Sequence, residues 1–460
     1  MISKAAAERV LAEAVRTGGD FAELFMEDTR SSSLTLVDGA IDSANTGRRH
    51  GAGIRIYNGL EGIYVHTNDT TEAGLMKAAR QAASAVGAKD IARDIRLTGS
   101  IARNIHAIER LPMDVGGAEK SRLVHAAYQA AKDYDSAVKQ VRVTLMGKET
   151  DVLIANTEGL FTGDRRVYTR FSVVAMASNG QENQTGSQSP GAMMGYELFR
   201  DRVDVEASAR HAAETAVIML RADKCPGGVM PVIIDNGFGG VIFHEACGHS
   251  LEATQVALGN SEFCGKMGQQ IASPIVTAVD DGTMPNEWGS LNIDDEGTPT
   301  TRLVLIENGV LKNYMIDRLN GRRMQMASTG SARRQDYTFA PTSRMRNTFI
   351  AAGRDDEEEI IATAGDALYA RQMGGGSVNP ATGEFNFAVM EGYLVRGGRI
   401  DRPVRGATLV GKGSEILKKI DRVGRNMKMA QGMCGSKSGS IPTNVGQPMI
   451  RVTDITVGGR

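Results

Sequence analysis

The hexapeptide His244-Glu245-Ala246-Cys247-Gly248-His249 restricts the local fold of this chain more than any other segment does. It places two of only seven histidines around a carboxylate, and the composition predicts roughly 0.01 such arrangements by chance. Two imidazoles beside a Glu are typical of a zinc site, in which nitrogen atoms bind the metal and the carboxylate takes a proton from water. The segment therefore predicts a metal site.

The five-residue spacing of the two histidines has a structural consequence. On a regular α-helix, residues five apart are rotated by about 140°, so both imidazoles could not reach one ion. We therefore predict a wide turn or a helix end between His244 and His249, and we expect Gly248 to permit it through unusual backbone angles. The alternative is a pair of ordinary helix histidines, one buried and one in contact with water.

Three later motifs accompany the hexapeptide: Asp-Glu-Gly-Thr-Pro-Thr at residues 295–300, Ala-Pro-Thr-Ser-Arg-Met-Arg-Asn-Thr at residues 340–348, and Gly-Met-Cys-Gly at residues 432–435. Together the four motifs resemble the TldD branch of the TldD/TldE (PmbA) zinc metalloprotease family. The resemblance covers essentially the whole chain and is strongest from about residue 225 onward.

The resemblance implies a role for each residue of the site. His244 and His249 would be zinc ligands, Cys434 would be the remaining ligand, and Glu245 would be the general base and acid. Spacing alone does not choose the thiolate, because Cys264 is nearer in sequence and Cys247 lies inside the hexapeptide. The family pattern continues after its Cys with Gly-Lys, whereas residues 435–437 here are Gly-Ser-Lys, so we expect a different local loop.

Two functions remain open at this stage. The first is a zinc-dependent peptidase that hydrolyses unfolded or extended peptides with water activated by the metal, Glu245 being the base. The second is a non-catalytic regulatory or binding subunit that keeps a structural zinc. Structural sites usually have four protein ligands rich in Cys, so three ligands next to Glu245 favour catalysis. The motif alone also allows an amidase or another hydrolase that uses the same hydroxide, and it is the resemblance that implies peptide substrates. The resemblance also implies a TldE-like partner subunit, with a homodimer as the alternative.

The composition limits the partners and the cellular compartment that we expect for this protein. The 53 basic and 54 acidic side chains give a net charge of -1, which provides no general attraction for nucleic acid or for an anionic membrane. The four cysteines are scattered and form no Cys-x-x-Cys pair, as expected in a reducing cytoplasm. Residues 1–19 read as an amphipathic helix rather than a signal peptide, and no apolar stretch approaches the ~20 residues of a membrane span.

The pattern of apolar residues predicts an α+β fold. Helices are expected at residues 3–17 and 71–86 around short strands at 23–27, 33–37, 53–57 and 62–66. A similar order recurs, with helices at 119–133 and 205–220 around strands at 140–146, 151–155 and 166–177. We therefore predict an N-terminal α+β domain at 1–92, a connector at 93–117, and a central α+β domain at 118–222 that repeats the first.

Residues 223–460 are predicted to form a C-terminal metallopeptidase domain. A buried strand at 229–235 leads to Asn236, a candidate helix cap, and then to the metal-binding helix. Alternating runs at 301–306, 385–390, 408–410 and 450–457 predict a mainly antiparallel sheet around that helix, not a doubly wound one.

Other polar features are open to two interpretations. The acidic residues 280, 281 and 294–296 could supply oxygen ligands to a metal or could be solvated turn residues. Arg344 and Arg346 could bind a peptide carboxylate or form structural ion pairs. Residues 406–413 approach a phosphate-binding loop, but Gly413 stands where Ser or Thr is needed, so we predict no nucleotide or other organic cofactor.

Overall fold

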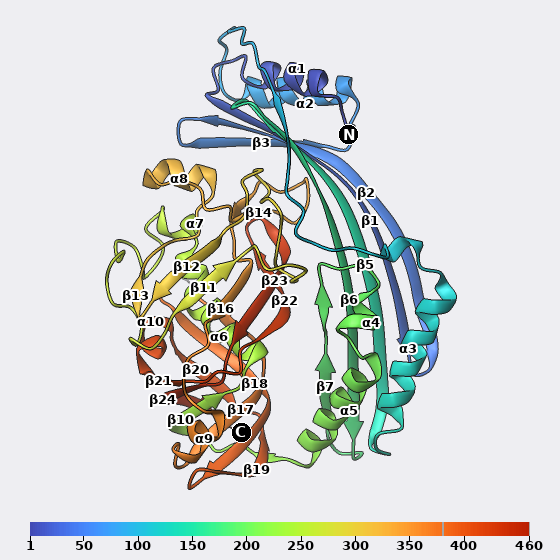
Figure 1. The fold of residues 1–460 in the computed structure, drawn as a ribbon, viewed down its shortest axis with the longest axis vertical. Helices are drawn as coiled ribbons and strands as arrows, with labels where there is room; N and C mark the ends of the chain where they lie inside the picture. The colour runs from blue at the N-terminus through green and yellow to red at the C-terminus, as the bar shows by residue number, and fades with distance from the viewer. Residues whose placement is uncertain (380, 460) are drawn as a thin grey trace.

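The computed structural model describes residues 1–379 and 381–459, and it confirms the α+β class predicted from the sequence (Figure 1). A long curved sheet of eight strands forms one side of the molecule, in the order β3-β2-β1-β5-β6-β4 with β7 and β8 on β6. All pairings in this sheet are antiparallel except that of β4 with β6. Its strands are β1 (Phe21–Val37), β2 (Ala40–Asn58), β3 (Glu61–Thr67), β4 (Thr98–Ile101), β5 (Val138–Asn156), β6 (Leu160–Ser178), β7 (Asn183–Gln188) and β8 (Gly191–Ala192).

The central strands are longer than the sequence pattern predicts. The two segments expected at 23–27 and 33–37 belong to the single strand β1, because the polar residues between them include neither Gly nor Pro. The segments at 140–146 and 151–155 likewise form one strand, β5. Gly147 lies inside β5 without ending it, and a Cβ there would come within 2.4 Å of Pro112 Cβ. The glycine therefore allows close packing and does not form a turn.

Helices cover the long sheet at both ends. The helices α1 (Lys4–Ala14) and α2 (Glu72–Ser84) pack at one end, while α3 (Gly117–Lys132), the short α4 (Leu198–Asp201) and α5 (Val205–Arg221) lie at the other (Figure 1). Side chains of Ser3, Thr71 and Asp204 accept the hydrogen bonds that begin α1, α2 and α5. The short 3₁₀ segment η1 (Pro112–Asp114) lies within the predicted connector.

A helix, two long strands and a second helix thus follow one another twice, as α1, β1, β2 and α2 with β3 before α2, and as α3, β5, β6 and α5 with β7, β8 and α4 before α5. Both sets of strands belong to one sheet, in which β1 pairs with β5 from Glu23 to Val37. The division into domains at 1–92 and 118–222 stays a prediction.

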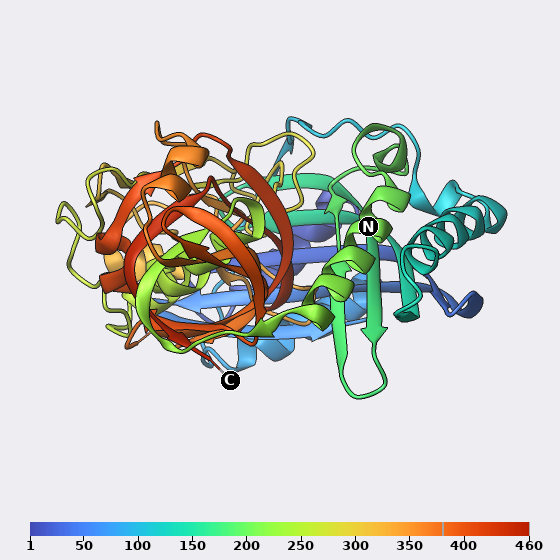
Figure 2. The same ribbon diagram turned by 90° about the horizontal axis from the view of Figure 1, so that it is seen from below.

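The second half of the chain forms a barrel and a smaller sheet. The barrel closes because β17 pairs with both β10 and β18, and Figure 2 shows it end-on as a ring. Its sheet consists of β9 (Asp223–Lys224), β10 (Gly228–Ile234), β17 (Ala367–Val378), β18 (Glu384–Arg396), β19 (Arg399–Arg405), β20 (Thr408–Lys412), β21 (Ile420–Val423) and β24 (Ile450–Gly458).

The smaller sheet has the order β13-β12-β11-β16-β23-β22, so β22 is an edge strand. Its strands are β11 (Ala278–Asp281), β12 (Arg302–Glu307), β13 (Val310–Leu311), β16 (Asn347–Ile350), β22 (Lys428–Ser436) and β23 (Gly439–Gln447). The remaining elements are β14 (Ala332–Arg333), β15 (Thr342–Ser343), α8 (Arg318–Met324), α9 (Glu357–Ala362), α10 (Gly413–Ile416) and η5 (Leu417–Lys419). Most pairings are antiparallel, as predicted; β9–β19, β10–β17 and β16–β23 are parallel.

Buried ion pairs join the long sheet to the second half. Arg55 of β2 contacts both Glu23 and Glu296 at 2.7 and 2.8 Å, and Arg166 of β6 contacts Asp295 at 2.6 Å. Asp295 and Glu296 are therefore neither solvated turn residues nor free to bind a metal, because arginines from distant strands neutralise them. Asp294 is also buried, and it accepts hydrogen bonds from three backbone N–H groups. Among the described helices, none is long and apolar enough to cross a membrane.

Candidate metal centre

The hexapeptide lies in a short, irregular helix that follows β10, a strand that is buried from Val232 to Ile234. The chain passes from β10 through η2 (Gly237–Gly240) and α6 (Val241–Phe243) into η3 (His244–Gly248) and η4 (His249–Leu251), before α7 (Ala253–Val256). Asn236 stands at the beginning, but its side chain does not cap the helix as predicted; it donates to the carbonyl of Asn426. Phe243 and Cys247 anchor the segment in the main hydrophobic core.

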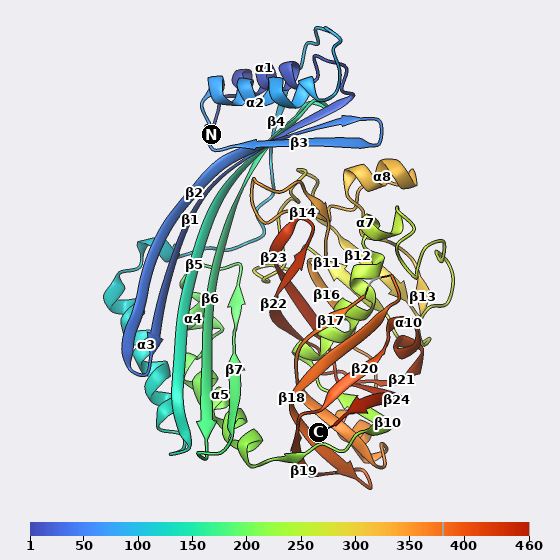
Figure 3. The same cartoon turned by 180° about the vertical axis from the view of Figure 1, so that it is seen from behind.

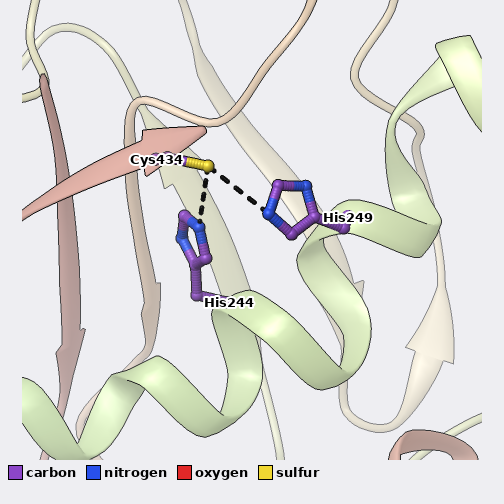
Figure 4. Close-up of side chains that lie close together, drawn as sticks. All are labelled: His244, His249 and Cys434. Carbon is purple, nitrogen blue, oxygen red and sulfur yellow. Dashed lines mark hydrogen bonds between the residues drawn. The ribbon is translucent and has the colours of Figure 1, made fainter. Parts of the chain in front are cut away.

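The deformation predicted from the histidine spacing is a single π-helical turn. Its five residues run from His244 to Gly248, and the backbone N–H of His249 donates to the carbonyl of His244. The wider turn brings the two imidazoles onto one side, with ring centroids 5.1 Å apart and planes at 85° (Figure 4). An ordinary pair of helix histidines, one buried and one in contact with water, does not describe this arrangement.

The prediction that Gly248 adopts unusual backbone angles is wrong. Its backbone angles, φ -52° and ψ -52°, are ordinary helical values that any residue adopts. A Cβ at this position would instead come within 2.2 Å of the sulfur of Met345, so the glycine leaves room for that side chain. The glycine therefore lets the π turn pack closely against the loop before β16.

Cys434 reaches the two histidines from a distant part of the chain. It lies on β22, which pairs with β23 as a hairpin, and its Sγ is 3.3 Å from Nε2 of His244 and 3.4 Å from Nε2 of His249 (Figure 4). Within the described residues, the ligand atoms of these three side chains lie within 4.8 Å of one another. Cys264 contacts the carbonyl of Val256 instead, and Cys247 is buried in the core.

The electrostatics of the group favour a thiolate. Burial raises the pKa of Cys434, but the adjacent imidazoles of His244 and His249 outweigh burial and leave that pKa well below its ordinary value. Burial lowers the pKa of His249, whereas Glu252 and Cys434 raise it, and the net shift is upward. In contrast, burial raises the pKa of Cys247, which keeps that thiol protonated.

Two carboxylates flank His249. Glu245 Oε2 lies 3.7 Å from Nε2 of His249, the nitrogen that faces Cys434, and its side chain is 23% exposed. Glu252 Oε1 lies 3.3 Å from the other ring nitrogen, Nδ1, and this side chain is only 1% exposed. Glu245 can therefore reach both the group of three and water, while Glu252 is placed to orient the ring. Sequence reasoning missed Glu252, although its position three residues after His249 was visible.

Arg344 and Arg346 form structural contacts rather than a site for peptide carboxylates. Both side chains are fully buried. Arg346 pairs with Asp280 at 2.7 Å. Arg344 donates to the carbonyl of Cys434 at 2.5 Å, and its Nε lies 3.8 Å from Glu252 Oε1. Arg344 thus links the strand that carries Cys434 to the carboxylate beside His249.

A cleft of about 540 Å³ reaches Met433, the residue before Cys434 on β22, but His244, Glu245, His249 and Cys434 do not line it. One wall is the edge strand β22 from Met429 to Met433, and the other walls come from β6, β7 with the two residues after it, β17, β18 and η2. Four methionines and Phe238 make part of the lining apolar, and Met433 is half exposed. Flexible methionine side chains adapt to apolar groups of different shapes. The cleft was not visible in the sequence.

The α+β fold with a buried His, His and Cys group beside a carboxylate defines a candidate metal-binding protein, and sequence comparison gives its family. Family models described as PmbA/TldA metallopeptidase domain 1, central domain and C-terminal domain match residues 22–86, 110–220 and 227–459. The chain belongs to the PmbA/TldA metallopeptidase family.

Individual relatives agree with this assignment. The chain is 35% identical over 452 residues to the Metalloprotease TldD homolog of Haemophilus influenzae, covering 96% of this chain and 93% of that protein. It is 29% identical over 289 residues to the Zinc metalloprotease TldD homolog of Saccharolobus solfataricus, covering 63% of this chain and 64% of that protein.

Solved structures share the fold. A Thermotoga maritima protein described as a candidate modulator of a DNA gyrase superposes with a TM-score of 0.81 at 22% identity, covering 99% of both chains. TldE from Thermococcus kodakarensis superposes with a TM-score of 0.78 at 18% identity, covering 99% of this chain and 100% of that one. At these identities the likeness concerns the fold alone.

Proposed function

We propose that this chain is a zinc-dependent peptidase that hydrolyses unfolded or extended peptides. The observation that carries the proposal is the convergence of His244 Nε2, His249 Nε2 and Cys434 Sγ, with Glu245 beside them. Two imidazoles and a thiolate fit zinc, which takes N and S ligands. The relative named a zinc metalloprotease supports the same metal.

Each residue of the site would have its own part in peptide hydrolysis. His244, His249 and Cys434 would hold the zinc, which lowers the pKa of bound water to about 7. Glu245 would take a proton from the attacking water at its carboxylate and deliver it to the leaving amine. Its partial exposure and its 3.7 Å separation from His249 support this role, because a small side-chain movement would bring both transfers within reach. Glu252 would hold the His249 ring so that Nε2 faces the metal.

Catalysis accounts for this site better than a structural zinc does. A structural site is normally closed by four protein ligands, whereas the described residues bring three together and leave a carboxylate beside them. The cleft would receive the peptide, and the edge strand β22 along its wall would suit an extended chain. The free thiols of all four cysteines are compatible with a cytoplasmic location, which we include in the proposal.

Glu245→Gln tests the proposal directly. The substitution keeps the shape of the side chain but cannot accept the proton, so we expect stoichiometric zinc with hydrolysis of an unfolded peptide reduced by at least about 100-fold. Glu415→Gln, on α10, is a control outside the site. Turnover near that of the wild type, with zinc retained, would exclude Glu245 as the base and would favour the non-catalytic alternative.

The proposal includes a second subunit. The fold shared with TldE supports a TldE-like partner, with a homodimer as the alternative, and a partner would enclose the site so that extended peptides enter and folded proteins do not. The assay compares a short peptide, an unfolded protein and a compact folded domain, with and without the TldE-like subunit. Equal cleavage of the folded domain would refute enclosure, and full activity of the monomer would refute the need for a partner.

A further inference from the structure

Arg170 of β6 is the only charged side chain among the described residues that line the cleft of about 540 Å³. In the part of the chain that the structure describes, no carboxylate pairs with it; burial lowers the pKa of Arg170, and no nearby charge offsets that effect. In contrast, Arg166 on the same strand pairs with both Asp164 and Asp295. Arg170 is therefore a partly buried cation without an anion.

The guanidinium of Arg170 is held in place, but its hydrogen-bonding capacity is not filled. Its Nε donates to the carbonyl of Ser189 at 3.2 Å, and one Nη donates to the carbonyl of Gln431 at 3.4 Å. The group lies over the ring of Trp288, 5.2 Å from the centroid. A Cβ at Gly191 would lie 3.0 Å from Arg170 and 3.1 Å from Trp288, so this glycine makes room for the stacked pair. A guanidinium has five N–H groups, and two are used, so the other three have no partner among the described residues.

A fixed guanidinium without a counter-charge is suited to bind an anion. Burying a charge costs free energy unless the charge is paired. A structural link between β6 and β22 does not require a cation, because a neutral donor can bind the same two carbonyls. Arg binds carboxylates through two parallel hydrogen bonds, which gives both strength and a defined orientation. The charge and the unused donors of Arg170 therefore indicate a carboxylate ligand in the cleft.

Strand β22 links Arg170 to the candidate metal centre. Gln431 and Gly432 accept hydrogen bonds from Arg170 and Trp288, and Cys434 follows on the same strand. Figure 3 shows β22 on the side of the second half that faces the long sheet. The three residue steps from Gln431 to Cys434 span about 10 Å. A peptide extended alongside β22 would thus have about three residues between Arg170 and the metal centre.

We propose that Arg170 is a specificity-determining residue that binds a carboxylate of the peptide substrate, about three residues from the cleaved bond. The inference rests on the proposed peptidase function, because it names the peptides that this site selects. The carboxylate is either the C-terminus of the peptide or an Asp or Glu side chain, since both present the same pair of oxygens. The methionines of the cleft would contact neighbouring apolar side chains of the peptide.

Four versions of one unfolded peptide distinguish the two sources of the carboxylate. The parent peptide is compared with its C-terminal amide, with a version in which Asn and Gln replace every Asp and Glu, and with a version that carries both changes. We expect the fully neutral version to lose about 10- to 100-fold in kcat/KM with the wild type, mainly through KM. A loss in the amide assigns the C-terminus, and a loss in the Asn and Gln version assigns a side chain. Mass spectrometry should place the cleaved bond about three residues from that carboxylate.

Arg170→Gln tests the residue itself. It should lower kcat/KM for the parent peptide by the same factor of about 10 to 100 and should leave the fully neutral peptide unchanged. Arg170→Lys keeps the charge without the bidentate geometry, so it should retain part of the preference. Arg142→Gln is the matched control, because Arg142 is an exposed arginine of β5 in the same sheet that does not line the cleft. It should keep the full preference.

The outcomes separate this inference from the proposed function. Equal cleavage of the parent and the neutral peptide by the wild type, or an equal loss for both with Arg170→Gln, would overturn the inference and leave the peptidase function intact. An equal loss for both is the result expected of a purely structural Arg170. Zinc-loaded wild type that cleaves none of the peptides would refute the peptidase function instead. Fluorescence anisotropy of the labelled peptides would then still test Arg170, and equal binding of the charged and neutral versions would overturn its role.

Discussion

Glu252→Gln offers the sharpest test of how the metal centre is built. The carboxylate lies 3.3 Å from Nδ1 of His249, the ring nitrogen that faces away from Cys434, and it is 1% exposed. Gln keeps the volume of the side chain and removes its charge. The substitution therefore isolates what the carboxylate does for the ring and for Arg344, whose Nε lies 3.8 Å away.

The expected loss of zinc affinity is 10- to 100-fold. A full ion pair at 3.3 Å would contribute about 5 kcal/mol at an effective dielectric constant of 20. However, an imidazole that binds a metal is neutral, so the carboxylate acts by orienting the ring and increasing its basicity. Loss of such a partner typically costs 10- to 100-fold in metal affinity, or about 1.4 to 2.7 kcal/mol. We therefore base the expected loss of zinc affinity on the orienting effect, not on the larger energy of a full ion pair.

A second effect concerns the protein without metal. Arg344 is fully buried and keeps three oxygen acceptors, on Cys434, Ser438 and Gly439, when Glu252 loses its charge. Breaking a buried pair costs about 3 to 5 kcal/mol. Because three hydrogen bonds remain, we expect a loss of about 3 kcal/mol in the free energy of unfolding.

Chelator competition measures the zinc affinity, and urea unfolding of the apo form measures stability. Glu391→Gln is the matched control. Glu391 lies on β18, outside the group of three; it is equally buried and pairs with Arg371 at 2.9 Å. We expect this control to lose stability and to keep its zinc affinity. A zinc affinity of Glu252→Gln within about twofold of the wild type, or an equal loss in the control, would refute the orienting role.

Three further predictions concern ligands and pH. We expect elemental analysis to find one zinc per chain and His244→Ala or His249→Ala to abolish it, and stoichiometric zinc in both variants would contradict the site. Cys434→Ser should weaken zinc binding by about 100-fold or more, and Cys264→Ser should not; the reverse order would show that the ligand is misassigned. Burial raises the pKa of Glu27 to about 7. Since the pKa is higher in the folded state, stability from this group is present below pH 4.5 and lost as pH rises through 7. Glu27→Gln should therefore stabilise the protein by about 3 kcal/mol at pH 8 but not at pH 4, measured by urea unfolding. Equal effects at both pH values would contradict the shift.

The local part of the site could be predicted from the sequence, and the distant part could not. The spacing of His244 and His249 required a deformed helix, because helix geometry alone separates residues five apart, and the π turn is that deformation. Cys434 lies 185 residues after His249 and arrives through the β22–β23 hairpin. Periodicity carries no information about such a contact, so only the family resemblance selected this cysteine.

Several of the sequence predictions were wrong for one physical reason: the side chains involved contact residues from distant parts of the chain. Gly248 was expected to permit the turn through unusual backbone angles, yet its lack of a Cβ instead makes room for Met345 from another segment. The sequence around Asp295 is typical of a solvated turn, yet the residue is buried and forms an ion pair with Arg166. The long strand β1 reads as two, because its exposed middle lacks alternation. Local pattern therefore predicted element types better than the environment of each side chain.

The split origin of the three candidate ligands also links metal binding to tertiary structure. His244 and His249 occupy one π turn, but the group is complete only when β22 packs beside that turn and brings Cys434 to within 3.4 Å. Arg344 connects the same two elements, through the carbonyl of Cys434 and the carboxylate of Glu252. Because a metal that binds only the assembled group stabilises the assembled state, its binding free energy contributes to the docking of the hairpin. The arginine would keep the hairpin docked in the protein without metal, so the ligand atoms are in place before the ion arrives.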